Sequence, residues 1–145
     1  KGIIYVGIGQ RTNEKGINFL REHFDHKIVP IRIKDPKEGE DVLHLDCAFV
    51  PVGKDLALIY KEGLKKLPEE IGENYKLIEV TKEEQENLAT NVFSISPDIV
   101  ISRDISERIN KILEKEGLEV IPLKFDGAPK SGGSFRCSTL PTFRD

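Results

Sequence analysis

Residues 44–60, HLDCAFVPVGKDLALIY, carry the pattern that decides the expected fold of this chain. Two apolar runs, residues 44–52 and 55–60, are typical of β-strands, and they flank Gly53-Lys54. Runs of this kind on either side of a short glycine-containing turn predict a β-hairpin. The unit is completed by a helical stretch and a third strand, expected over residues 63–71 and 76–80.

The same order of elements returns later in the chain. Residues 92–95 and 99–102 flank the turn sequence SPD, which again predicts a hairpin. A helix follows, with the apolar stripe Ile105, Ile109, Ile112 and Leu113, and a closing strand is expected over residues 118–124. A version without its first strand begins at Gly2, with a strand, a helix and a strand expected over residues 2–8, 14–24 and 27–33. A last strand is expected over residues 135–140.

The closing strands of the three units resemble one another. They read KIVPIRI, YKLIEV and LEVIPLK, and they recur at intervals in the forties of residues. Repeats of about this length indicate modules packed around a common axis. The repeat is equally compatible with an ordinary α+β domain whose units look alike by chance.

The composition describes one domain with a mixed, near-neutral surface. The chain has 145 residues, of which 38% are hydrophobic, and its net charge is −3. The apolar runs are too short for a membrane span, and the charge balance argues against a nucleic-acid binder. Two cysteines favour reduced thiols and a cytoplasmic location over a disulfide scaffold or a four-cysteine zinc site. The absence of Met predicts that the sequence is part of a longer protein.

Residues 132–141, GGSFRCSTLP, are the most specific candidate for chemistry. Cys137 follows a glycine pair, where the backbone can approach a substrate closely. The preceding Arg136 would favour the thiolate, which is the nucleophilic form of cysteine. The alternative is that Cys137 is a small buried residue of the core, the commoner fate of a lone cysteine.

A second candidate is the segment His44-Leu45-Asp46-Cys47. On a strand, His44 and Asp46 point to the same face, while Cys47 points to the other face and is expected in the core. An imidazole can move protons at neutral pH, and a neighbouring carboxylate can hold a cation. The alternative is a solvated His–Asp pair at the start of a strand.

Four stretches of the chain together resemble the guanidino-group modifying enzymes. These are IGQRTNEKGI, HLDCAFVPVGKDLAL, LATNVFSISPD and GGSFRCSTLP, in the expected order. The superfamily contains arginine deiminases, dimethylarginine dimethylaminohydrolases and amidinotransferases. The resemblance implies the pentein fold, an α/β propeller of five ββαβ modules. About three of the five would be present, so that residues 1–145 form the C-terminal portion of a single catalytic pentein domain.

The resemblance also implies a role for each site residue. Cys137 would attack the guanidinium carbon, and His44 would protonate the departing amine and then activate water. Asp46 would bind the guanidinium nitrogens, which a carboxylate can do bidentately. Gln10 stands where arginine deiminases usually carry a glutamate before Arg-Thr, and its neutral amide would orient His44. The substrate would be a small cationic guanidino compound, and neither a metal nor an organic cofactor would be needed.

Three functions remain open from the sequence. The first is hydrolysis of the guanidino C–N bond of arginine or a derivative through a covalent thiouronium intermediate, with citrulline as a product. The second is an amidinotransferase that uses the same Cys–His pair with an amine acceptor, and the His-x-Asp pattern favours the deiminase and amidinotransferase branches. The third is a non-catalytic pentein binding module. In each case the open module faces are expected to be covered by the missing N-terminal half or by a second copy.

Overall fold

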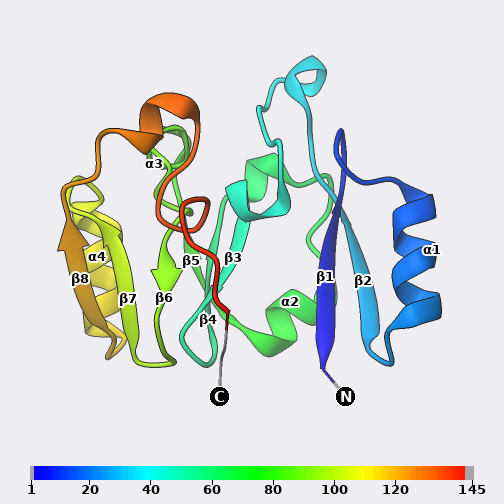
Figure 1. Ribbon diagram of the computed structural model, residues 1–145, viewed down its shortest axis with the longest axis horizontal. Helices are drawn as coiled ribbons and strands as arrows, with labels where there is room; N and C mark the ends of the chain where they lie inside the picture. The colour runs from blue at the N-terminus through cyan, green and yellow to red at the C-terminus, as the bar shows by residue number, and fades with distance from the viewer. Residues whose placement is uncertain (1, 143–145) are drawn as a thin grey trace.

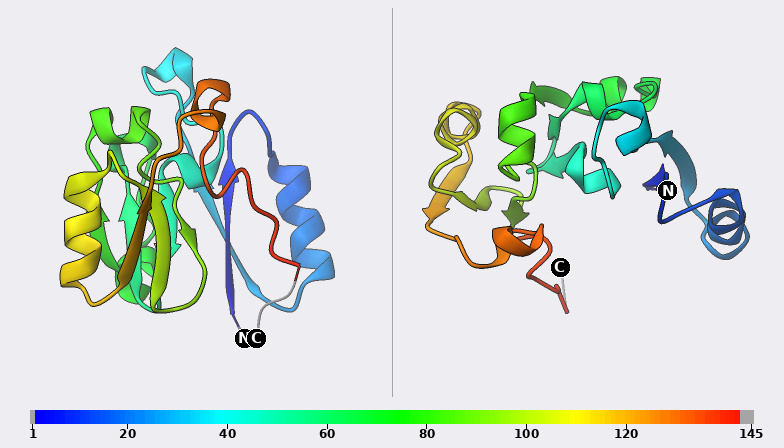
Figure 2. Two further views of the ribbon diagram at one scale, coloured as in Figure 1. Left: turned by 60° about the vertical axis from the view of Figure 1, so that its left-hand side comes forward. Right: turned by 90° about the horizontal axis from the view of Figure 1, so that it is seen from above.

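The structure is a computed structural model that describes residues 2–142 of the chain. Within these residues the strands form three small sheets that stand side by side (Figure 1). Seen from above, the helices lie along the outer side of a curved row of sheets, and the C-terminal segment lies along the inner side (Figure 2). The chain is thus a mixed α/β structure built from repeated units.

The first sheet contains two parallel strands, β1 (Ile3–Ile8) and β2 (Lys27–Arg32), joined through helix α1 (Glu14–His23). Asn13 begins the helix, because its side chain accepts hydrogen bonds from two backbone N–H groups of the first turn. This is the unit without a first strand, as the sequence predicted.

The second sheet begins with the hairpin of β3 (Phe49–Val52) and β4 (Leu56–Ile59), which pair in antiparallel fashion. Gly53 has a positive φ of 67° in the turn between them, a conformation that glycine adopts without a steric penalty. Strand β5 (Lys76–Glu79) then pairs with β4 in parallel. The hairpin and the closing strand are therefore confirmed, with the first strand shorter than expected.

The helix expected over residues 63–71 was wrong in its position. A single 3-10 turn covers Lys61–Gly63, and helix α2 (Glu69–Asn74) begins only after Pro68. Proline has no backbone N–H and disfavours a helical residue before it, so it is tolerated at the start of a helix. Pro68 therefore precedes the helix instead of interrupting it.

The third sheet repeats the order of the second. Strand β6 (Phe93–Ser94) pairs with β7 (Ile99–Arg103) in antiparallel fashion, and β8 (Glu119–Leu123) pairs with β7 in parallel. Helix α4 (Glu107–Lys115) connects β7 to β8, and a short helix α3 (Lys82–Glu86) precedes the unit. The repeated strand–strand–helix–strand order predicted from the sequence is confirmed.

The hydrophobic core is centred on the second sheet. Every residue of β4 is buried, and core side chains from the first and third units pack around this sheet, among them Ile31, Val100 and Leu113. Among residues 2–142, no helix has both the length and the apolar character that a membrane span needs. The middle sheet thus holds the outer two in place, and with them the segments that connect the sheets.

Gly63 is closely surrounded by core side chains. A Cβ atom added there would lie 2.7 Å from Cγ2 of Val42 and 3.2 Å from Cβ of Ala48. These two residues flank the segment that contains His44. The contact with Val42 is not easily relieved, because β-branched side chains have few alternative rotamers.

We expect Gly63→Ala to lower the free energy of unfolding by about 1–3 kcal/mol, because the added methyl group overpacks the core. Gly72→Ala is the matched control, since no contact within 4 Å arises for its added Cβ among the described residues. Gly72 lies inside α2, where alanine is more favourable by about 0.5–1 kcal/mol. Urea denaturation of both variants measures the difference, and equal stabilities would contradict the packing described.

Candidate active site

The segment around Cys137 folds as a helical turn, and the strand expected over residues 135–140 does not form. The backbone N–H of Ser138 donates to the carbonyl oxygen of Ser134 at 3.0 Å and closes the turn. Phe135 anchors it, because its buried ring stacks on Phe125 with 4.5 Å between the ring centroids. Cys137 itself is exposed, so it is not the buried core residue of the alternative interpretation.

The cysteine packs closely against the glycine pair. A Cβ atom at Gly133 would lie 2.8 Å from Cβ of Cys137 and 3.3 Å from its Sγ. Packed side chains leave no room for such an approach, so a larger residue at this position would displace the thiol or the turn. The close approach therefore requires glycine at position 133.

Asn91 holds the turn of residues 134–138, hereafter the cysteine turn, and lies just before the first strand of the third sheet. Its Oδ1 accepts hydrogen bonds from the backbone N–H groups of Ser134 and Cys137, at 2.9 and 3.2 Å. Its Nδ2 donates to Sγ of Cys137 at 3.1 Å. Its backbone carbonyl oxygen accepts from the N–H of Arg136 at 3.3 Å. A single residue therefore fixes the turn at three of its residues.

Thr90, the residue before Asn91, connects the Asn91 segment to the segment that contains His44. Thr90 donates from Oγ1 to the carbonyl oxygen of Cys47 at 3.3 Å, and it is buried. The chain enters this segment through Leu88, which has a φ of 62°. A left-handed conformation is costly for a residue with a Cβ, and it persists where the surrounding structure enforces it.

The segment that contains His44 and Asp46 is not a strand. His44 precedes a 3-10 turn over Leu45–Cys47, and the strand begins only at Phe49. Phe49 pairs with Ile59, the last residue of β4, so β4 offers no strand residue opposite the earlier segment. The expectation that strand alternation places His44 and Asp46 on one face was therefore wrong.

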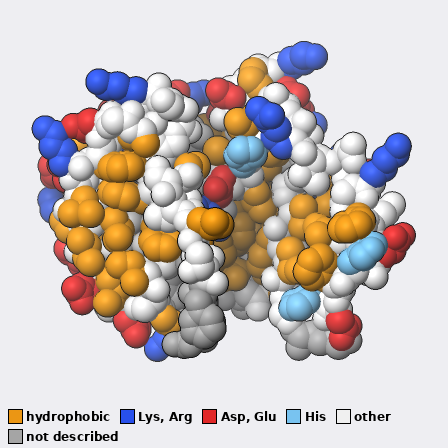
Figure 3. All heavy atoms as spheres, in the orientation of Figure 1, with side chains coloured by type: hydrophobic (Ala, Val, Ile, Leu, Met, Phe, Trp, Pro, Cys, Tyr) orange, Lys and Arg blue, Asp and Glu red, His pale blue; other side chains and the backbone are white. Residues whose placement is uncertain are grey.

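His44 and Asp46 nevertheless line the same hollow, together with Arg136 from the cysteine turn. The volume of the hollow is about 470 Å³, and residues of β1 and β3 form its apolar walls. The face drawn in Figure 3 is hollowed near its middle, with hydrophobic side chains around the depression. Residues far apart in the sequence thus meet at one place on the surface.

Asp46 and Arg136 form an ion pair inside this hollow. Nε of Arg136 lies 3.4 Å from Oδ2 of Asp46, whose side chain is 26% exposed. The other carboxylate oxygen, Oδ1, is buried and has no hydrogen-bond partner among the described residues. Oδ2 is therefore the oxygen through which this carboxylate meets a cation. Arg136, expected beside the thiol, pairs with the carboxylate instead.

Gln10 lies elsewhere. It is exposed and lines a separate hollow formed by residues that precede and begin α1. The hollow of His44 and Asp46 does not include it. The structure therefore brings together two of the residues singled out from the sequence, places Cys137 directly after the wall residue Arg136, and leaves Gln10 apart.

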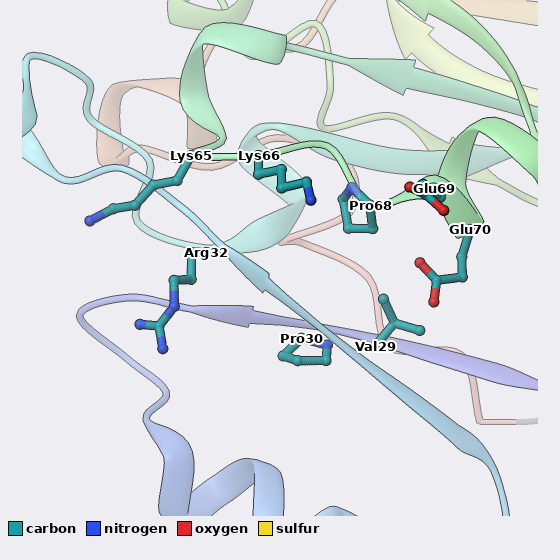
Figure 4. A pocket seen from close by; sticks show the side chains of 8 residues that line it. All are labelled: Val29, Pro30, Arg32, Lys65, Lys66, Pro68, Glu69 and Glu70. Carbon is teal, nitrogen blue, oxygen red and sulfur yellow. The ribbon is translucent and has the colours of Figure 1, made fainter.

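A further surface hollow, of about 430 Å³, lies between β2 and α2 (Figure 4). Two of its cations are already paired, Arg32 with Glu14 at 2.7 Å and Lys65 with Glu38 at 2.6 Å. Its lining contains no cysteine or histidine. Among residues 2–142 no group of His, Cys, Asp and Glu side chains is arranged to hold a metal ion. The hollow of His44 and Asp46 is therefore the candidate active site.

The two cysteines differ in their surroundings. Cys47 is partly buried and packs against the core, and this burial raises the pKa of its thiol. The nearby carboxylate of Asp46 raises the pKa of Cys47 further. Both effects disfavour its thiolate, so Cys47 is poorly suited to act as a nucleophile.

The comparison with known proteins assigns the chain to a family. A sequence profile described as "N,N dimethylarginine dimethylhydrolase, eukaryotic" matches residues 1–144. The chain belongs to this dimethylarginine dimethylhydrolase family. It is thereby a member of the guanidino-modifying pentein superfamily, which the sequence resemblance implied. The family carries the name of the branch that the His-x-Asp pattern did not favour.

Two curated proteins are similar to this chain in sequence. The "Uncharacterized protein YkgA" of Bacillus subtilis (strain 168) is 39% identical over 144 residues, which are 98% of this chain and 49% of that protein. The L-arginine:L-lysine amidinotransferase of Pseudomonas savastanoi pv. phaseolicola is 28% identical over 141 residues, 89% of this chain and 38% of that protein. The chain therefore spans half or less of the length of these relatives.

Solved structures support the fold. An amidinotransferase of the saxitoxin biosynthetic pathway from Microseira wollei superposes with a TM-score of 0.83 at 23% identity, over 98% of this chain and 44% of that one. The N-terminal domain of the cyanobacterial arginine dihydrolase ArgZ gives 0.80 at 24% identity, over 94% of this chain and 50% of that one. At these identities the likeness concerns the pentein fold.

We expect Cys137 to be alkylated by iodoacetamide much faster than Cys47 at pH 7, because it is exposed while Cys47 is partly buried. The raised pKa of Cys47 keeps its thiolate scarce at this pH, and its rate should increase as the pH rises towards that pKa. Peptide mass spectrometry after timed labelling gives both rates from one sample. Preferential labelling of Cys47 at pH 7 would contradict the assignment of the reactive thiol.

Proposed function

We propose that this chain carries the thiol, the imidazole and one carboxylate of an active site that cleaves a guanidino C–N bond. The observation that carries this proposal is the pairing of Asp46 with a guanidinium, that of Arg136, in the hollow that also contains His44. Arginine has the functional group that the proposed substrate would present. The same carboxylate geometry that receives Arg136 would therefore receive arginine or a derivative such as a methylated arginine.

In the proposed reaction the Cys137 thiolate attacks the guanidinium carbon and forms a C–S bond. The C–N bond to the leaving group then breaks, and His44 gives its proton to the departing ammonia or amine. A thiouronium remains on the cysteine. Water attacks the same carbon while His44 takes a proton from it, and the C–S bond breaks to release a ureido product and the thiol. For arginine, that product is citrulline. The covalent step divides one difficult displacement into two easier ones.

The carboxylate contributes by orientation and charge. Asp46 would align the planar guanidinium through Oδ2, the oxygen that meets the guanidinium of Arg136. Holding the cation in the hollow also favours the thiolate of Cys137, because an opposite charge nearby stabilises the ionised form. The remaining contacts to the substrate would come from modules outside this chain, either an N-terminal portion of the same protein or a second copy. Residues 1–145 would then be the C-terminal portion of such a catalytic domain.

A transferase that uses an amine in place of water is the second candidate. It is favoured by the relation to the L-arginine:L-lysine amidinotransferase, which is 28% identical over most of this chain. The chemistry of the first half-reaction is the same in both cases, since only the nucleophile that attacks the thiouronium changes. Hydrolase and transferase therefore require the same Cys137, His44 and Asp46.

We expect Asp46→Asn to lower kcat/KM for arginine or methylated arginine at least about tenfold, because a charge-assisted contact to the substrate is lost. Cys137→Ser should lower it on the order of 10³-fold or more. Asp98→Asn is the control, because the Asp98 side chain is 72% exposed and pairs with Lys54 at the hairpin turn. Steady-state assays of the full-length protein test the proposal, and activity retained in Cys137→Ser would refute it.

The reaction products show whether water or an amine attacks the thiouronium. If water is the acceptor, a ureido product should accumulate at the same rate with and without added glycine or lysine. If an amine is the acceptor, the amine should become amidinated and the ureido product should decrease in proportion. Separation of the products by mass spectrometry distinguishes the two, and failure to turn over any guanidino compound would favour a non-catalytic binding module.

A further inference from the structure

The side chain of Asn91 makes hydrogen bonds of two kinds, to the backbone of the cysteine turn and to the sulfur of Cys137. Through Oδ1 it accepts from the backbone N–H groups of Ser134 and Cys137, which fixes the turn. Through Nδ2 it donates to Sγ of Cys137 at 3.1 Å, which acts on the reactive atom itself. Asn91 is only 4% exposed, so water does not easily replace these contacts. Backbone support alone would not require the contact to sulfur.

We propose that Asn91 is a positioning residue that directs the sulfur of Cys137 and favours its thiolate. The inference rests on the proposed role of Cys137 as the nucleophile. An N–H donor binds an anionic acceptor about twice as strongly as a neutral one, and hydrogen bonds to the charged form of a group favour that form. The amide is neutral, so it stabilises the thiolate without placing a second cation where a guanidinium substrate must bind.

Other titratable groups lie around this turn. Arg136 belongs to the turn itself and pairs with Asp46, and His44 lines the same hollow. Cys47 lies next to Asp46 in the chain, and its carbonyl oxygen accepts the hydrogen bond of Thr90. The charge of Arg136 is partly neutralised by the carboxylate that it pairs with. The direct hydrogen bond to Sγ of Cys137 comes from Asn91 and from none of these charged groups.

Two variants separate the two purposes of the side chain. Asn91→Asp keeps an oxygen acceptor for the backbone N–H groups but has no N–H donor for sulfur, whereas Asn91→Ala loses both. We expect the pH at which Cys137 is alkylated at half its maximal rate to rise by about one unit or more in both variants, roughly tenfold less thiolate at neutral pH. The shift in Asn91→Ala separates loss of the donor from the charge that aspartate adds. Amide hydrogen exchange at Ser134 and Cys137 should increase in Asn91→Ala only.

Asn110→Asp is the matched control. Asn110 is also a buried asparagine, and its Nδ2 donates to the carbonyl oxygen of Arg103 at 2.9 Å, away from the cysteine turn. The substitution is expected to lower stability and to leave the pH profile of Cys137 alkylation unchanged. An unchanged profile in either Asn91 variant, or an equal shift in Asn110→Asp, would overturn the proposal.

A measurement on the unsubstituted full-length protein keeps the proposal testable if the variants do not fold. With ¹⁵N-asparagine labelling, the side-chain amide resonance of Asn91 should move with the same pH midpoint as the alkylation rate of Cys137. Alkylation of Cys137 should shift that resonance strongly, and a resonance that does not respond to either would refute the contact. Neither readout depends on turnover, so a protein without guanidino activity would disprove the proposed function and leave the role of Asn91 at the thiol standing.

Discussion

The arrangement of the candidate site depends on the hydrogen bonds of one buried amide, that of Asn91. Its oxygen and nitrogen bind the cysteine turn at two backbone N–H groups and at sulfur, although the turn lies in a distant part of the sequence. Thr90 beside it binds the segment of His44 and Asp46 through the carbonyl oxygen of Cys47. Because buried polar groups must be satisfied, the two neighbours can stay buried only while both segments remain in place. The pair therefore couples the position of the thiol to that of the carboxylate.

The site uses the connections between modules. The His44 segment precedes the first strand of the second sheet, and Thr90 and Asn91 precede the first strand of the third sheet. The cysteine turn follows the last strand, β8. The hairpin of the middle sheet is largely buried, whereas the connecting segments carry polar side chains to a common hollow. Repetition of the module along the curved row gives the chain several such connections (Figure 2).

Much of the fold could be predicted from the sequence, because strand and turn signals are local. The hairpins around Gly53 and Pro97 and the helix that ends before Gly117 follow from short patterns of apolar and turn residues. The conformation at His44 and Cys137 could not be predicted, because it depends on where a partner strand ends and on hydrogen bonds to Asn91. His44 and Cys137 both lie in stretches whose local pattern predicts strands. The sequence did not single out Thr90 and Asn91 as site residues, although both lie in the stretch LATNVFSISPD. Only the folded chain shows that Thr90 binds the His44 segment and that Asn91 binds the turn around Cys137.

Because Arg136 pairs with Asp46, its side chain competes with any cationic ligand for the same carboxylate. The guanidinium of Arg136 is attached one residue from the thiol, so its effective concentration at the carboxylate is set by the chain and exceeds that of a dilute metabolite. A ligand that needs Oδ2 of Asp46 binds only the fraction of molecules in which Arg136 has moved away, and its apparent affinity falls by that fraction. Under the proposed function, a substrate that makes contacts beyond its guanidinium would displace Arg136 more readily than a bare cation, so the ion pair would favour larger substrates.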